Sequence, residues 1–167
     1  MAAMQIEQLR SRVRGAIVQP DGESYDSVRR LYNGMIDKRP AVIVRCVDVA
    51  DVIAAIDYAR TNNLLTAVRG GGHNGAGLGS CDDGLVIDLS QMRGIHVDPA
   101  ERTVRVEGGA LWGDVDHATH PFGLAVPCSA TRIGGGKQAS ATGTGAGSAK
   151  KAIALNGVDF TGISRSA

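Results

Sequence analysis

Apolar residues recur at helical spacing in four parts of the chain, which predicts four helices. Two short ones cover residues 4–14 and 24–32. The third and clearest begins at Asp48, whose carboxylate can cap the helix, and ends at Asn62. The fourth covers residues 110–119. The positions expected to face the core are Val49, Val52, Ile53, Ile56 and Ala59 in the third helix and Leu111, Trp112, Val115 and Ala118 in the fourth.

Runs of β-branched and aliphatic residues between these helices predict strands. They cover residues 41–47, 64–68, 85–89, 94–97, 103–106 and 124–126. The connection at residues 98–102 is short and polar, as in a hairpin. Helices and strands do not alternate regularly, so the chain is expected to form a mixed α+β domain and not a doubly wound sheet.

From Gly136 onward the residues are small, polar and basic, and they follow neither a helical nor a strand period. This change divides the chain into a folded domain over residues 1–135 and a divergent, flexible tail over residues 136–167. Within the tail, Asn156-Gly157 is the centre of a weak potential hairpin.

The strand at residues 64–68 runs directly into Arg69-Gly70-Gly71-Gly72-His73. Successive glycines allow positive φ angles and can turn several backbone N–H groups toward one point, which forms a nest for phosphate oxygens. Arg69 can add a charged contact at the rim. The spacing matches neither GxGxxG nor GxxxxGK[ST], so a dinucleotide-binding Rossmann unit and a P-loop are disfavoured. A plain glycine-rich surface turn is the alternative.

Composition excludes several other classes. The chain is 43% hydrophobic, as in a globular protein, and its 18 Lys and Arg balance 17 Asp and Glu without a run of like charge. No nucleic-acid partner is therefore expected, and no apolar segment is long enough to cross a membrane. The three cysteines form no CxxC pair, and His117 and His120 lack an evident third metal ligand. We expect a cytoplasmic protein without a bound metal.

Four motifs in order along the chain resemble one known family. They are RPAVIVRCVDVADVIAAIDYAR, AVRGGGHNGAGLGS, GLVIDLSQMRGIHVDP and TVRVEGGALWGDVDHA. Together they resemble the FAD-binding domain of the p-cresol methylhydroxylase and vanillyl-alcohol oxidase superfamily, and most closely the berberine-bridge-enzyme-like bacterial oxidases. The resemblance covers residues 10–135 and implies a partial FAD-binding domain.

The resemblance also implies which residues bind FAD. Gly70, Gly71 and Gly72 would offer backbone amides to the diphosphate, with Arg69 before them. His73 matches the histidine that many members attach covalently to the flavin, although a histidine that only hydrogen-bonds the cofactor is the alternative. Asn74 and Gly77 would continue the wall of the site. Cys128 stands near the position of a second covalent link in some relatives, but Arg132 departs from the family pattern, so an unattached cysteine is the expectation.

By the same resemblance, a complete relative takes a hydride from an alcohol or amine carbon and passes the electrons to O₂. No catalytic residue is assigned in this chain, and its substrate cannot be read from these residues. A truncated or frameshifted product, inactive alone, is the expectation. Two alternatives stay open: an FAD- or phosphate-binding module completed by a separate chain that supplies the missing C-terminal half, and a non-functional fragment.

Overall fold

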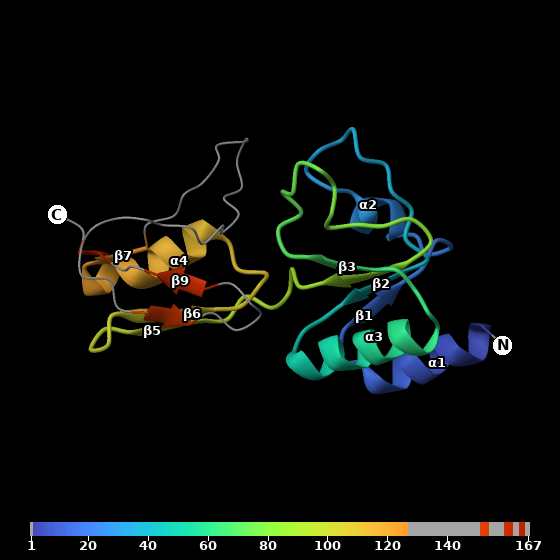
Figure 1. The fold of residues 1–167 in the computed structure, drawn as a ribbon, viewed down its shortest axis with the longest axis horizontal. Helices are drawn as coiled ribbons and strands as arrows, with labels where there is room; N and C mark the ends of the chain where they lie inside the picture. Colours follow the sequence, from blue (N-terminus) through green and yellow to red (C-terminus); the bar gives the residue numbers. More distant parts are fainter. Residues whose placement is uncertain (1, 127–150, 154–158, 162–163, 166–167) are drawn as a thin grey trace. The chain divides into compact units, whose positions relative to one another are not determined.

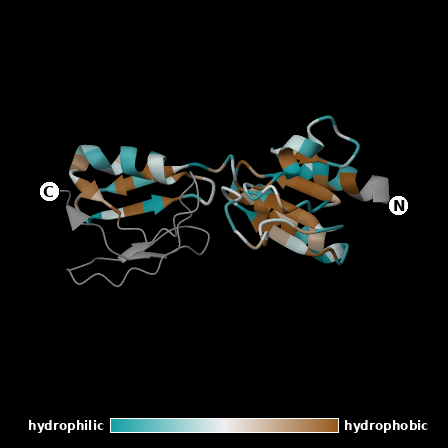
Figure 2. Cartoon of the chain, turned by 90° about the horizontal axis from the view of Figure 1, so that it is seen from above, coloured by the Kyte–Doolittle hydropathy of each residue, from teal (hydrophilic) through white to brown (hydrophobic). Residues whose placement is uncertain are grey.

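The computed structural model describes residues 2–126, 151–153, 159–161 and 164–165, with side-chain detail for residues 6–126. The chain divides into two compact units, Met1–Met92 and Arg93–Ala167. The apolar side chains gather in separate clusters within each unit, and the domain boundary at residue 135 stays a prediction. Figure 2 shows these apolar residues concentrated in the strands of both units.

The first unit is built on a four-stranded sheet in the order β1-β2-β4-β3. Its strands are β1 (Ala16–Val18), β2 (Val42–Arg45), β3 (Thr66–Arg69) and β4 (Leu85–Asp88). The last three are parallel, and β1 pairs antiparallel with β2. The sequence pattern predicted β2, β3 and β4 but missed β1, which is only three residues long and follows a glycine.

Helices cover both faces of this sheet. α1 (Ala2–Arg12) and α3 (Val49–Thr61) lie on one face, and the short helix α2 (Tyr25–Arg29) lies on the other (Figure 1). Alternate strand residues divide between the two layers, as the pleat of a strand requires. The layer under α1 and α3 includes Leu9, Val42, Val44, Ala55, Leu85 and Ile87, and the layer under α2 includes Tyr25, Ile43, Ala67, Cys81 and Val86.

The buried side of helix α3 agrees with the prediction only in part. Ala59 is buried and Val52 packs against the core, as predicted. Ile53 is 54% exposed, and Val49 and Ile56 are exposed with it, whereas Ala54 and Ala55 are buried instead. The reason is Asp51, which is fully buried in the first turn. Its carboxylate accepts hydrogen bonds from backbone N–H groups outside the helix, so the helix turns this side inward. The predicted cap is confirmed, because Asp48 accepts from the Asp51 amide at 3.0 Å.

Burial of Cys46 makes the first unit sensitive to alkaline pH. Burial, aided by the charges of Asp51 and Asp88, raises the pKa of the Cys46 thiol to about 12 from an ordinary value of 9.0. Between these two values the unfolded chain loses the thiol proton and the folded chain keeps it. The contribution of the Cys46 thiol to the free energy of unfolding is therefore fully present below the ordinary pKa. This contribution is lost as the pH rises above that value toward the pKa in the folded chain.

We expect this loss to be smaller in Cys46→Ala, which lacks the thiol. Urea unfolding of both proteins at about pH 8 and about pH 10.5, followed by circular dichroism, measures the difference. The Ala variant is less stable at both values because it loses buried volume, so only the change with pH is compared. Equal pH dependence in the two proteins would contradict the assignment.

The second unit has its own small core. The hairpin of β5 (Ile95–Asp98) and β6 (Thr103–Val106) packs with α4 (Trp112–Thr119). A short 3-10 helix, η1 (His120–Phe122), leads into β7 (Leu124–Ala125). The core side chains are Val104, Val106, Trp112, Val115, Leu124 and Val126. Trp112 and Val115 face the core as predicted, but Leu111 is exposed because it precedes the helix as its N-cap.

Three short strands lie within the predicted tail. β8 (Lys151–Ile153) pairs antiparallel with β9 (Asp159–Thr161). β10 (Ser164–Arg165) pairs with β7. Asn156-Gly157, the centre of the potential hairpin, lies outside the described residues. Over the described ranges, no helix combines the length and apolar character needed to cross a membrane.

Candidate functional site

The glycine-rich loop begins where β3 ends, at the carboxyl edge of the three parallel strands. Ligands of open α/β sheets bind at this edge, because the loops that follow parallel strands gather there. The loop begins at Gly70, and Gly72 adopts a φ of +71°, which only glycine reaches without strain. Predicted and observed positions of the loop therefore agree.

The first half of the loop leaves its backbone donors unused. The N–H groups of residues 70–75 donate no hydrogen bond to any residue that the structure describes. Consecutive unpaired amides around a left-handed glycine form the kind of concavity that binds phosphate oxygens. This half of the loop includes Gly70, Gly71 and Gly72, whose amides were predicted to contact the diphosphate, and His73, which was predicted to contact the flavin.

The second half of the loop is held by its own bonds. The Asn74 side-chain oxygen accepts from the amides of Ala76 and Leu78, each at 3.1 Å, and the Asn74 carbonyl accepts from Gly77. Gly77 is buried with a φ of +74°, and a Cβ at this position would lie 2.8 Å from Ile36. Asn74 and Gly77 thus fix the shape of the loop, and their contact with a cofactor stays a prediction.

Residues 31–39, here called the strap, lie along the loop. The Tyr32 amide donates to the Gly72 carbonyl at 3.2 Å, and the Asn33 side chain donates to the Gly75 carbonyl at 3.2 Å. The Lys38 ammonium group bonds the carbonyls of Gly77 and Ser80, both at 3.1 Å. The strap therefore binds carbonyl oxygens of the loop. The N–H groups of residues 70–75 stay available for another partner.

The strap is anchored by Arg29 at the end of α2. Its guanidinium group bonds the carboxylates of Asp26 and Asp37 and also the Lys38 carbonyl. The hydrogen bond from Arg29 holds the pKa of each carboxylate below its usual range. Arg29 also lies 5.8 Å from the centre of the Tyr25 ring. Arg29 therefore attaches the C-terminal part of the strap to α2.

His73 has a reactive nitrogen without a partner. Its Nδ1 atom is buried and forms no hydrogen bond with a described residue, although the whole side chain is only partly buried. The Tyr32 ring packs against the imidazole, with 4.7 Å between ring centres and an angle of 45° between planes. A buried ring nitrogen without a partner is costly, and a bound ligand would satisfy it.

Arg69 is not at the rim of the loop, where the sequence placed it. The residue is 6% exposed, and its Nη2 atom donates to Asp88 at 2.8 Å. Its aliphatic stem lies beneath the loop, since Cβ atoms at Gly72 and Gly79 would each lie 3.7 Å from it. The Nη1 atom is buried with no hydrogen-bond partner among the described residues. A cation of this kind beneath unpaired amides fits a diphosphate.

The sequence analysis missed the residues that support the loop from elsewhere in the chain. Tyr32 was predicted to end the helix over residues 24–32, but α2 ends at Arg29. Lys38 lies in a segment without periodicity, so no local signal identified its contacts. Asp88 carried a signal, because a carboxylate within a buried strand needs a cation or several donors. Arg45 is likewise a charged residue within a predicted strand.

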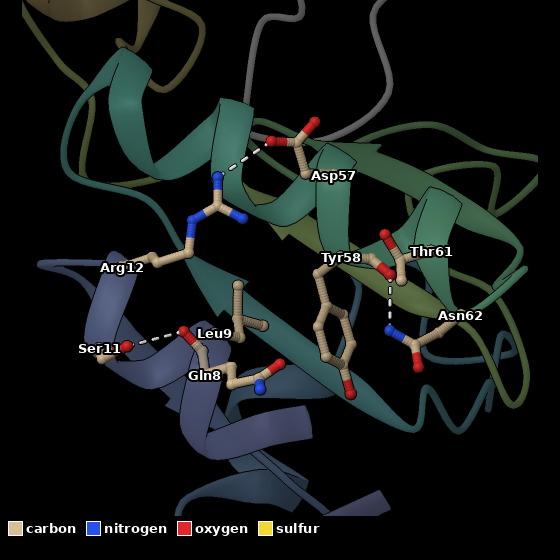
Figure 3. Close-up of a pocket in the computed structure, with 8 residues that line it drawn as sticks. All are labelled: Gln8, Leu9, Ser11, Arg12, Asp57, Tyr58, Thr61 and Asn62. Atoms are coloured by element: carbon tan, nitrogen blue, oxygen red, sulfur yellow. Dashed lines mark hydrogen bonds and ion pairs between the residues drawn. The ribbon is translucent and has the colours of Figure 1, made fainter. Parts of the chain in front are cut away.

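A second hollow lies apart from the loop, between α1 and α3. It is a cavity of about 340 Å³ that Figure 3 shows in close-up, lined by Gln8, Leu9, Ser11, Arg12, Asp57, Tyr58, Thr61 and Asn62. Its two charged side chains pair with each other, with 3.0 Å between Arg12 and Asp57. No unpaired donor or acceptor of these residues is buried there. The loop remains the better candidate.

The other candidate residues contribute no site in the described ranges. His96, His117 and His120 are exposed, and no group of three His, Cys, Asp or Glu side chains could hold a metal ion there. Cys46 and Cys81 are buried free thiols. Cys128, the candidate for a second flavin link, lies outside the described residues.

Comparison with known proteins relates this chain to FAD-binding domains. The profile of a family described as FAD binding domain matches residues 40–159, past the boundary predicted at residue 135. The chain is similar to (R)-6-hydroxynicotine oxidase of Paenarthrobacter nicotinovorans, 37% identical over 113 residues that cover 68% of this chain and 25% of that protein. It is also similar to the FAD-linked oxidoreductase hasG of Aspergillus fumigatus, 38% identical over 129 residues that cover 75% and 27%.

A solved structure gives the same result for the fold. The crystal structure of 6-hydroxy-D-nicotine oxidase from Arthrobacter nicotinovorans superposes with a TM-score of 0.67 and 36% identity, over 70% of this chain and 26% of that one. The chain spans about a quarter of the length of the relatives it matches. FAD is the cofactor of these FAD-linked enzymes, and the α+β fold is that of part of their FAD-binding domain. The chain therefore belongs to the FAD-binding domain family of the p-cresol methylhydroxylase and vanillyl-alcohol oxidase type, whose members include FAD-linked oxidoreductases.

Proposed function

We propose that the loop from Arg69 to Gly77 binds the diphosphate of FAD. The observation that carries this proposal is the set of unpaired N–H groups over residues 70–75, which lie above a buried guanidinium group. Amides and a fixed cation stabilise an anion without large reorganisation, because they already point where the charge will be. Gly72 supplies the backbone conformation, and Asn74 and Gly77 maintain it.

We further propose that His73 carries the flavin covalently. Its Nδ1 atom is buried and unpaired, and Tyr32 restricts the tilt of its ring. The new bond would replace one N–H of the imidazole and one C–H of the flavin methyl group. The two protons and two electrons released would leave with O₂ as H₂O₂. Such a bond would hold the cofactor in place and tune its electron affinity.

In this proposal the chain is the FAD-binding portion of an oxidase. When bound, FAD would accept a hydride from an alcohol or amine carbon, and O₂ would receive the electrons. The substrate pocket and catalytic base would come from protein beyond this chain, in the same polypeptide or in a partner half. Exposed apolar side chains near the loop support such a cover, among them Met35 at 91% and Leu78 at 69%. The chain alone is expected to be inactive.

Expression of the full chain with FAD supplied tests the proposal. We expect yellow protein that keeps its colour after acid precipitation and shows in-gel flavin fluorescence. His73→Ala is expected to lose all of the acid-stable flavin, because the attaching nitrogen is gone, while the loop still binds FAD reversibly. Visible absorbance of the flavin before and after precipitation measures both.

His96→Ala is the matched control, since His96 is exposed on β5 in the other unit. It should keep the flavin content of the wild-type chain. Colour that survives acid in His73→Ala would overturn the covalent role of His73. A wild-type chain that folds but retains no FAD at all would overturn the binding role of the loop.

A further inference from the structure

Three charged residues form a row across the carboxyl ends of the parallel strands, and Arg69, at one end of this row, lies beneath the loop. Arg45 ends β2, Asp88 ends β4 and Arg69 ends β3, and the strand register places Asp88 opposite both arginines. All three lie on the α2 face of the sheet, because their strand neighbours two residues earlier, Ile43, Val86 and Ala67, belong to the cluster on that face. We call these three residues the charge row.

Asp88 interacts more closely with Arg69 than with Arg45. Arg69 Nη2 lies 2.8 Å from Asp88 Oδ2, whereas Arg45 Nε lies 3.6 Å from the same oxygen, too long for a hydrogen bond. The other Asp88 oxygen accepts from the Ser90 amide at 3.0 Å. Asp88 is therefore occupied by Arg69 and the backbone, and Arg45 adds a second cation at longer range.

One positive charge of the charge row is left without a partner. Two guanidinium groups face a single carboxylate, whose side chain is 3% exposed. The Arg45 side chain is 32% exposed, but its Nε atom is buried with no hydrogen-bond partner among the described residues. Asp51, the other buried carboxylate nearby, lies on the opposite face of the sheet and is satisfied by backbone amides. A partly buried positive charge of this kind favours a nearby anion.

We infer that the charge row is part of the diphosphate site, with Arg45 as a positioning and charge-supplying residue. Asp88 holds Arg69 beneath the loop while leaving its Nη1 atom to donate, and Arg45 offsets the negative charge of Asp88. Without Arg45 the charge row has no net charge, and the diphosphate gains only the loop amides and the Nη1 atom of Arg69. This inference rests on the proposed function and deepens it, because it names Arg45 and Asp88, which lie outside the loop.

The test measures the affinity of the full chain for ADP, which carries a diphosphate but no flavin ring. Parallel strands lie about 4.8 Å apart, so Arg45 is about 10 Å from Arg69. A charge at that range is expected to change the affinity for a diphosphate about fivefold in about 50 mM salt. We therefore expect Arg45→Gln to bind ADP about fivefold more weakly than the wild type by calorimetric titration, and less than twofold more weakly in about 0.5 M salt.

Two further variants separate charge from structure. Arg45→Lys keeps the charge and should bind within about twofold of the wild type, whereas a merely structural guanidinium would make it as weak as Arg45→Gln. Arg60→Gln removes an exposed arginine of α3 and should leave the affinity unchanged. If Arg45→Gln loses its cooperative melting transition, Arg45→Met, which keeps the aliphatic stem, takes its place.

The outcomes also separate this inference from the proposed function. A wild-type chain that binds neither ADP nor FAD overturns the proposed function. A chain that holds FAD but does not bind ADP overturns both the diphosphate role of the loop and this inference, because the site then does not recognise the diphosphate. A chain that binds ADP with equal affinity in the wild type and in Arg45→Gln overturns the inference alone. A weakening that persists unchanged in high salt contradicts the electrostatic role.

Discussion

Replacing Asp51 with alanine is expected to lower the free energy of unfolding of the first unit by about 3–5 kcal/mol. The carboxylate is fully buried and accepts hydrogen bonds from the amides of Arg14 at 2.7 Å, Gly15 at 3.0 Å and Val47 at 3.0 Å. Removal leaves three donors in a poorly hydrated place, and each unpaired buried donor costs about 1–3 kcal/mol. The connection from α1 into β1 would lose its attachment to α3.

Hydrogen exchange of the amides of β2 and β4 measures this effect within the first unit alone. Trp112, the only tryptophan, belongs to the second unit, so its fluorescence does not report on the first. Asp57→Ala is the control, because its exposed pair with Arg12 should contribute less than about 1 kcal/mol. Equal protection in Asp51→Ala and Asp57→Ala would show that Asp51 does not hold this connection.

Substitution of Gly77 by alanine is the second change with a large expected effect, of about 2–4 kcal/mol. The φ of +74° disfavours any side chain, and the new Cβ would lie 2.8 Å from Ile36 in the strap. Either the strap moves away or the loop changes its conformation. Since the strap binds the loop carbonyls, both responses should also weaken the binding of FAD and ADP.

Gly75→Ala is a matched control within the same loop. A Cβ at Gly75 would meet nothing within 4 Å, and its φ lies outside the left-handed range. We expect Gly75→Ala to change the melting temperature and the ADP affinity little. Thermal melting with and without ADP compares the two variants. If Gly77→Ala behaves like Gly75→Ala, the contact between strap and loop does not determine the shape of the site.

The glycine-rich loop could be located from the sequence because its conformation depends on adjacent residues. A strand that runs into three glycines predicts a turn with unpaired amides wherever the rest of the chain lies. His73 lies in the same loop because it directly follows these glycines in the sequence. The role of Arg69 could not be predicted in the same way, because its partner Asp88 is 19 residues away and lies on a different strand. The sequence showed an arginine beside glycines, and an exposed rim was the simpler expectation.

Local chemistry alone determined the Asp48 cap, the hairpin after Asp98 and the glycine loop, since each depends on residues a few positions apart. The tertiary structure decided which side of α3 is buried and where the Arg69 charge lies. Asp51 reaches amides 36 and 37 residues before it, and apolar spacing cannot reveal such a partner. A buried carboxylate must be satisfied wherever its donors lie, and here that need outweighed the burial of Val49, Ile53 and Ile56.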